Sequence, residues 1–213
     1  MHFLSEALEK YITDHSEAEP ELLRALTRET HLKVIQPRMI TGHYQGRVLS
    51  MLSKLIRPHN ILEIGTYTGY ATLCLAEGLL PEGQIHTIEI NEELEDIQRR
   101  YFDQSPYSGQ IVSHIGDALS LVPKMDLEFD LVFIDAGKTD YDTHFENSIK
   151  KMRPGGVILS DNVLWSGKVA TAASPADKAT QALQAYNKKL MTNPRVETVI
   201  LPIRDGLTLS RVR

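Results

Sequence analysis

Two aspartates and an asparagine stand where a parallel sheet would bring them together. Asp135 closes the apolar run at residues 131–134, and Asp161 and Asn162 close a second run at residues 156–160. If these runs are neighbouring parallel strands, both carboxylates lie at the carboxyl edge of the sheet, where such sheets bind ligands. Two carboxylates and one amide oxygen suit Mg²⁺, Mn²⁺ or Ca²⁺ and suit zinc or copper poorly. A lone strand-end aspartate is more often a loop cap, but the Asp-Asn pair and a glycine motif upstream favour a metal site.

The glycine motif follows the first strand-like run. Gly65 and Gly69 flank a turn after residues 61–64, and a helical pattern follows. A dinucleotide-binding fingerprint would require glycine at two further positions, where this chain has Tyr67 and Tyr70. The bulky rings crowd the space that a pyrophosphate needs at a helix N-terminus. The turn therefore disfavours NAD or FAD and fits a nucleoside that carries no phosphate.

Three acidic residues near strand ends extend this interpretation. Glu89 ends the second strand-like run, at about the distance from Gly65 where an acidic residue binds ribose hydroxyls. Asp117, followed by Ala118, comes after the third run, where a polar group could meet an adenine ring. Glu63 precedes the turn and would favour a nearby cation. A cofactor that carries an adenine, a ribose and a positive charge but no phosphate is S-adenosylmethionine, which we therefore expect here.

Composition sets the broad class of the protein. The chain has 213 residues, of which 42% are hydrophobic and 24% charged, as in an ordinary globular domain. Its net charge of −5 provides no bulk basic field for nucleic acid. The single cysteine, Cys74, excludes a disulfide framework within the chain. The first residues do not resemble a signal peptide, and no apolar run approaches the roughly 18 residues of a membrane span, so we expect a cytoplasmic protein without membrane contact.

Alternating strand and helix patterns position these residues. The alternation predicts an α/β fold with a doubly wound, seven-stranded, mainly parallel sheet whose last strand is antiparallel. We expect one domain over residues 1–213, with a helical N-terminal extension at residues 1–57 and a cofactor- and metal-binding core at residues 58–213. The expected strands are residues 61–64, 85–90, 111–115, 131–134, 157–160, 196–201 and 207–211.

Local signals place several helix boundaries. The segment from Phe3 to Ile35 predicts two amphipathic helices divided near Pro20, and residues 37–45 predict a loop. Asn91 is expected to cap a helix whose first turn is acidic. Ser174, which precedes a proline, is expected to start another helix.

Four segments together resemble a known family, the cation-dependent O-methyltransferases, which include the caffeoyl-CoA and catechol O-methyltransferases and their bacterial relatives. The resemblance covers roughly residues 36–213. Its motifs are residues 61–70, 132–141 (VFIDAGKTDY), 154–167 (PGGVILSDNVLWSG) and 201–211 (LPIRDGLTLSR). The resemblance implies a Rossmann-like methyltransferase fold, a homodimer and an N-terminal segment that helps to cover the site.

The resemblance also implies roles for individual residues. Asp135, Asp161 and Asn162 would hold the metal, usually Mg²⁺, and Lys138 matches the family's catalytic lysine. Trp165 matches a tryptophan near the methyl acceptor. Three positions depart from the family. Gly137 replaces an acidic residue that is frequent in the plant branch, Ala71 replaces a serine that often contacts the cofactor, and Ser166 replaces an asparagine that contacts the acceptor in plant enzymes. The positions that match cofactor contacts are Thr41, Glu63, Gly65, Thr66, Tyr67, Glu89, Ala118 and Asp135.

These residues favour methyl transfer to a hydroxyl beside a second oxygen, as in a catechol, a small hydroxylated aromatic acceptor. Asp135 would hold the cation at the reacting oxygen, and Lys138, on the next loop, would take the acceptor's proton. One alternative keeps the chemistry but methylates 5-hydroxyuridine in tRNA, which would need a basic face formed by Arg24, Arg28, Lys33 and Arg38. Two others are a nucleotide-dependent oxidoreductase and a noncatalytic protein that binds an adenosyl ligand.

Overall fold

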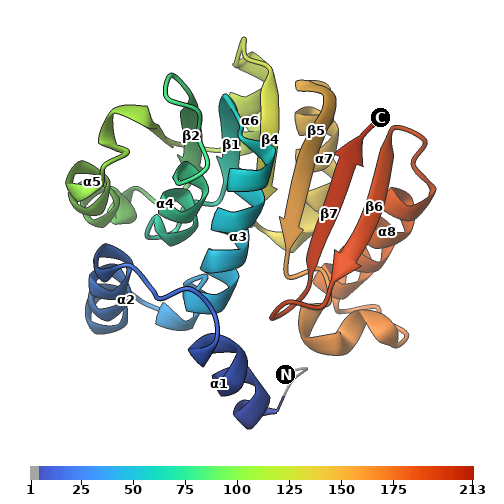
Figure 1. The fold of residues 1–213 in the computed structure, drawn as a ribbon. Helices are drawn as coiled ribbons and strands as arrows, with labels where there is room; N and C mark the ends of the chain where they lie inside the picture. Colours follow the sequence, from blue (N-terminus) through green and yellow to red (C-terminus); the bar gives the residue numbers. More distant parts are fainter. Residues whose placement is uncertain (1–4) are drawn as a thin grey trace.

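The fold is built on a seven-stranded sheet with helices on both faces (Figure 1), as seen in a computed structural model that describes residues 5–213. The strand order is β3-β2-β1-β4-β5-β7-β6. Every neighbouring pair is parallel except the two pairs that β7 makes, so the predicted doubly wound sheet with a reversed last strand is confirmed. The strands are β1 (Asn60–Ile64), β2 (Gln84–Glu89), β3 (Ile111–Ile115), β4 (Phe129–Ile134), β5 (Met152–Asp161), β6 (Val196–Leu201) and β7 (Leu207–Val212).

Alternate strand residues build two apolar cores, one on each face of the sheet. Ile61 packs on the face covered by α3 (His43–Ile56), α4 (Tyr70–Ala76) and α5 (Glu95–Gln104). Leu62 and Ile64 pack on the opposite face. Helix α3 crosses in front of the sheet in Figure 1, and α7 lies behind it. Because both faces are covered, the central strands read as continuous apolar runs in the sequence. The second face is covered by α6 (Ala118–Leu121), α7 (Tyr141–Ile149) and α8 (Lys178–Thr192).

The strand register brings the two predicted aspartates side by side. Ile134 of β4 is aligned with Ser160 of β5. Asp135 and Asp161 are the next residues on these strands, so they reach the same carboxyl edge of the sheet. In Figure 1 this edge is where the arrowheads of β4 and β5 point, toward α1. The neighbouring placement that the sequence predicted for these strands is therefore confirmed.

The N-terminal segment forms the predicted pair of helices, with one boundary that differs. Helices α1 (Glu6–Asp14) and α2 (Glu21–Lys33) are divided at Pro20, whereas Phe3, the expected first residue, lies outside the described residues. The expectation of a loop through residue 45 is wrong, because α3 already begins at His43. Gly42 has a φ of 79° and turns the chain directly into that helix.

Two helix starts test the capping signals. Asn91 Oδ1 accepts a hydrogen bond from the Glu93 backbone N–H at 3.1 Å, so the predicted cap is confirmed, although the first turn is a 3₁₀ helix. The start predicted at Ser174 is wrong, because α8 begins at Lys178. Ser174 Oγ closes a tight turn by accepting from the Ala176 N–H at 3.3 Å, and Asp177 is the residue that caps the helix.

Residues 202–206 form the predicted tight turn between β6 and β7. Short 3₁₀ helices complete the other connections. They are η1 (Pro37–Met39), η2 (Glu92–Leu94), η3 (Ser108–Gln110), η4 (Val122–Lys124), η5 (Lys138–Asp140) and η6 (Trp165–Ala170).

Across residues 5–213, no helix combines the length and the apolar character that crossing a membrane requires.

Candidate functional site

A cavity of about 2000 Å³ lies at the carboxyl edge of the sheet. Its walls come from the strand ends, from the segment around residues 33–45 and from α1. Most of the predicted site residues line it, although they come from distant parts of the chain. They are Thr41, Gly65, Tyr67, Glu89, Asp117, Ala118, Asp135, Lys138, Asp161, Asn162, Trp165 and Ser166.

Three predicted cofactor residues lie elsewhere. Thr66 and Ala71 line a small second cavity, which shares Thr41 and Gly65 with the large one. Glu63 lines neither of these two cavities and is completely buried beneath the turn. Its carboxyl group accepts hydrogen bonds from Thr72 and Thr87, as a residue that supports the turn from below would do.

Gly65 allows the turn after β1 to approach the end of β4. Its φ is 99°, and an added Cβ would lie 1.9 Å from the Asp135 carbonyl oxygen. No side chain fits there, so a glycine is required at this point. The turn is also bonded to both neighbouring strands, since the Gly65 N–H donates to the Ile88 carbonyl at 3.0 Å and the Asp135 N–H donates to the Ile64 carbonyl at 2.8 Å.

Glu89 is held rigidly at the end of β2. One carboxylate oxygen accepts from the Tyr67 backbone N–H at 2.6 Å and the other from the Asn91 N–H at 2.9 Å. A carboxylate oxygen can accept a second hydrogen bond, so both oxygens stay available to a diol. Further along the same edge, Asp117 is exposed and caps α6 through the Leu119 N–H at 2.9 Å.

Asp135 and Asp161 form the acidic part of the cavity. Asp161 is only 3% exposed, and burial together with the nearby charge of Asp135 raises its pKa. Asp161 Oδ1 accepts from the Asn162 backbone N–H at 2.7 Å, and Oδ2 accepts from Gln45 Nε2 at 2.7 Å. Asn162 has a left-handed φ of 57°, which asparagine tolerates better than most residues. Two carboxylates are thus close enough to repel each other in a partly dry site.

Lys138 stands beside these carboxylates, at the start of η5. Its side chain is 9% exposed, and Nζ donates to Asp135 Oδ1 at 3.1 Å and to the Tyr141 hydroxyl. The Tyr141 hydroxyl in turn donates to the Asp161 backbone carbonyl at 2.8 Å. Burial and the two aspartates raise the pKa of Tyr141 well above its ordinary value, so the phenol stays protonated and orients the lysine.

Trp165 and Ser166 form a turn over the same cavity. Both have left-handed φ values, 49° and 54°, and the Ser166 backbone N–H donates to the Asp205 carboxylate. Trp165 also packs against the apolar core beneath α7 and α8. Its indole thus combines a core contact with one surface on the cavity.

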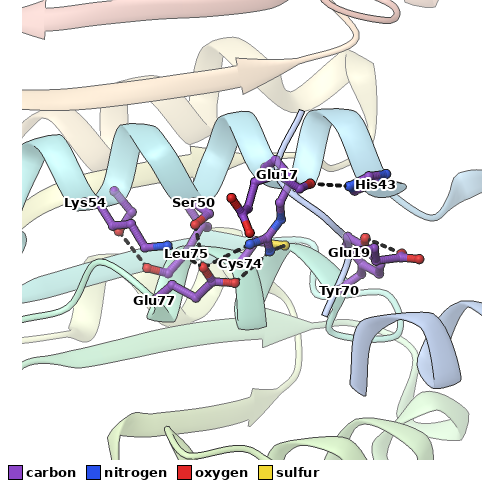
Figure 2. A network of polar contacts seen from close by, with 11 residues as sticks. Glu17, Glu19, His43, Ser50, Lys54, Tyr70, Cys74, Leu75 and Glu77 are labelled. Atoms are coloured by element: carbon purple, nitrogen blue, oxygen red, sulfur yellow. Dashed lines mark hydrogen bonds and ion pairs between the residues drawn. The ribbon is translucent and has the colours of Figure 1, made fainter. Parts of the chain in front are cut away.

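Sequence reasoning missed two residues that touch the acidic edge. Tyr141 was expected only to start and pack a helix, and Gln45 fell in an expected loop. The helical spacing of Gln45 with Leu49 and Leu52 was the available signal. His43 also lines the cavity, and its Nε2 donates to the Glu17 carbonyl at 2.7 Å, an arrangement visible in Figure 2.

The acidic edge fits a hard divalent cation in its donor chemistry. Asp135 and Asp161 supply carboxylate oxygens and Asn162 an amide oxygen, the ligands that Mg²⁺ and Ca²⁺ prefer. A cation would also relieve the repulsion that raises the pKa of Asp161. Within residues 5–213, no three residues of the His, Cys, Asp and Glu types gather around one point.

The strand order with the reversed β7 is that of a class of proteins, the S-adenosylmethionine-dependent methyltransferases with a Rossmann-like fold, to which a similar O-methyltransferase solved with SAH belongs. Within that class the chain belongs to the O-methyltransferase family, whose model matches residues 13–213.

Similar proteins include enzymes from plants and bacteria. A caffeoyl-CoA O-methyltransferase of Petroselinum crispum is 37% identical, covering 97% of this chain and 91% of that protein. A catechol O-methyltransferase of Niastella koreensis is 30% identical, covering 98% of this chain and 97% of that protein. A Bacillus cereus O-methyltransferase structure in complex with SAH has a TM-score of 0.89 and 29% identity, and covers 97% of each chain.

The protein is therefore an S-adenosylmethionine-dependent O-methyltransferase. The resemblance inferred from the four motifs is confirmed. The oxidoreductase and noncatalytic alternatives are set aside, because the family is one of methyl-transferring enzymes.

Proposed function

We propose that this enzyme methylates one of two adjacent oxygens on a small hydroxylated aromatic acceptor, such as a catechol, with a divalent cation held by Asp135, Asp161 and Asn162. The observation that carries the proposal is the β4–β5 register, which aligns Ile134 with Ser160 and so presents both carboxylates to one cavity. Mg²⁺ is the expected cation, and Mn²⁺ or Ca²⁺ would suit the same oxygens.

The cofactor lies along the β1–β2 side of the cavity in this proposal. Glu89 accepts hydrogen bonds from the two ribose hydroxyls, since each of its carboxylate oxygens keeps a free lone pair. Asp117 and Ala118 border the adenine, and the turn at Gly65 passes close to the methionine part. Thr41 closes the cavity from the N-terminal side.

Three residues contact the methyl acceptor in this proposal. Methyl transfer is an in-line displacement, in which the oxygen–methyl bond forms as the methyl–sulfur bond breaks and S-adenosylhomocysteine leaves. The attacking oxygen must therefore be held at roughly 3 Å from the methyl carbon. Lys138, as the neutral amine, receives the proton of the acceptor hydroxyl, and Trp165 and Ser166 form the wall against which the ring lies. A bound divalent cation would stabilise the acceptor's oxyanion beside Asp135 and Asp161.

A screen of acceptors with labelled S-adenosylmethionine tests the function. Catechols should be methylated in Mg²⁺, compounds with a single phenol much less, and a chelator should stop the reaction. Equal rates for catechol and simple phenol in chelator would overturn the proposal.

The tRNA alternative belongs in the same screen. It needs a basic face. Arg24, Arg28 and Arg38 are exposed, and Arg38 lines the cavity, whereas Lys33 is paired with Glu29 at 3.0 Å. Because the net charge is −5 and the similar proteins are named for caffeoyl-CoA and catechol, we favour the small acceptor. Labelling of unmodified tRNA, with none of the phenols labelled, would reverse that preference.

A further inference from the structure

Gln45 reaches the acidic edge from the N-terminal part of the chain and leaves half of its amide unused. It lies in the first turn of α3, lines the cavity and is 1% exposed. Its Nε2 donates to Asp161 Oδ2 at 2.7 Å, while its Oε1 is buried without a hydrogen-bond partner among residues 5–213. An ionised carboxylate only accepts hydrogen bonds, so the amide nitrogen must face Asp161 and the oxygen must face elsewhere.

An unpaired buried carbonyl is costly enough to need an explanation. Leaving such a group unsatisfied costs about 1–3 kcal/mol. The cost persists only if the surrounding structure prevents Gln45 from rotating or withdrawing, so the packing of α3 has to account for it.

Helix α3 is fixed tightly against α4. A Cβ at Gly46 would lie 2.6 Å from the Tyr70 ring and 2.9 Å from Cys74 Sγ, so the two helices approach as closely as a glycine allows. One turn further along, the Glu77 carboxylate at the end of α4 collects donors from α3 (Figure 2). Gln45 is therefore held in place by the residue next to it and by the network that follows. The donors to Glu77 are Arg47 at 2.6 Å, Ser50 at 2.6 Å and Lys54 at 2.7 Å.

We propose that Gln45 is a positioning residue for the cation site, an inference that rests on the proposed function. Its amide nitrogen fixes the plane of the Asp161 carboxylate, which is one of the proposed cation ligands.

Both oxygens of Asp161 are occupied by fixed donors, which supports the positioning role. The backbone N–H of Asn162 holds Oδ1 and Gln45 holds Oδ2. Each oxygen keeps one lone pair for a cation, and its direction is set by these two bonds. Losing a partner that orients a metal ligand typically weakens metal affinity about 10–100-fold.

Gln45→Met tests the inference, because methionine is similar in size and cannot hydrogen-bond as an amide does. Mg²⁺ affinity is measured by calorimetry on the full chain with saturating S-adenosylhomocysteine and no acceptor. We expect Mg²⁺ affinity to fall about 10–100-fold and S-adenosylhomocysteine affinity to change less than about twofold. Gln45→Asn, whose amide is too short to reach Asp161, should give the same loss if the methionine variant does not fold.

Gln98 provides a matched control. It is also a 1% exposed glutamine with an unpaired Oε1, but its Nε2 donates to the Tyr67 carbonyl at 2.7 Å, away from the aspartates. Gln98→Met should therefore leave Mg²⁺ affinity unchanged. An equal loss of Mg²⁺ affinity in both methionine variants would show a general loss of packing and would overturn the positioning role.

Unchanged Mg²⁺ affinity in Gln45→Met would refute the inference while leaving the proposed function intact. A wild-type protein that does not bind Mg²⁺ would remove both.

Discussion

Lys138 is the residue on which the proposed chemistry most depends. Its amine lies between the Asp135 carboxylate and the Tyr141 hydroxyl, and Tyr141 connects it to the end of β5. This arrangement can fix a base beside the acceptor, but it can equally fix a positive charge. Only substitution separates the two roles.

We predict that Lys138→Met lowers kcat about 10²–10⁴-fold, the usual contribution of a general base, and leaves S-adenosylhomocysteine affinity nearly unchanged. Lys138→Arg keeps the charge but cannot accept a proton near neutral pH. The arginine variant should be as slow as the methionine variant in single-turnover assays. Near-normal kcat in the arginine variant would assign Lys138 an electrostatic role instead.

Glu63 predicts an alkaline limit on stability. Burial, with smaller effects from Asp135 and Glu89, raises its pKa to about 8. The folded state therefore holds a proton that an unfolded glutamate loses near pH 4.5, and stability from this site falls as pH rises from that value through 8. Glu63→Gln, which stays neutral, should gain roughly 2–3 kcal/mol over wild type between pH 6 and pH 9. Denaturant unfolding of both proteins at these two pH values checks this, and parallel pH profiles would contradict it.

At the scale of elements, the turn between β6 and β7 supports two walls of the cavity. Arg204 donates to the Ile40 carbonyl at 2.9 Å and to the Thr41 carbonyl. Asp205 binds the turn that carries Trp165, through the backbone N–H groups of residues 164 and 166. The last hairpin in the chain therefore fixes segments on both sides of the site.

Replacing Arg204 should make the part of the cavity wall that contains Thr41 less rigid. We predict that Arg204→Met weakens S-adenosylhomocysteine binding about tenfold, because two partly buried hydrogen bonds from a charged donor are lost. Arg211→Met on the same hairpin is the control, since among the described residues the one ion pair of Arg211 is an exposed 3.9 Å contact with Glu197. Calorimetric titration of both variants with S-adenosylhomocysteine tests this. Equal affinities of the two variants for S-adenosylhomocysteine would contradict the supporting role of the turn.

The strands and the pair of aspartates could be predicted from sequence because buried parallel strands are apolar runs with a polar residue at the end. The start of α8 could not, because Ser174 and Asp177 both suit a cap and only the folded turn chooses between them. Gln45 was missed because its hydrogen bond to Asp161 joins distant parts of the chain. Likewise, no local pattern shows that Glu63 lies beneath the turn rather than in the cavity.

At the scale of the whole molecule, the N-terminal helices form part of the cavity wall. Residues of α1 line the cavity, and the segment that joins α1 to α2 is bonded through Glu17 to His43 and through Glu19 to Tyr70 (Figure 2). We propose that residues 1–57 act as a cover on a core at residues 58–213 and that the two form one domain.

We also propose that the chain forms a homodimer, as the family resemblance implies. Met51 and Leu55 on α3 are 58% and 73% exposed, and burial against a second copy would remove these apolar side chains from water. Light scattering after size exclusion should give twice the 24.0 kDa chain mass. The double variant Met51→Lys, Leu55→Lys should have the mass of the monomer. A monomeric wild-type protein would contradict the dimer.

The most direct test is the initial rate of catechol methylation as free Mg²⁺ is raised from chelator conditions, for wild type and Asp161→Ala. Wild type should be inactive in chelator and saturate with Mg²⁺, while Asp161→Ala should stay inactive yet bind S-adenosylhomocysteine normally. A wild-type rate that is the same with and without Mg²⁺, or an alanine variant that is fully active in chelator, would contradict a cation held by Asp135, Asp161 and Asn162.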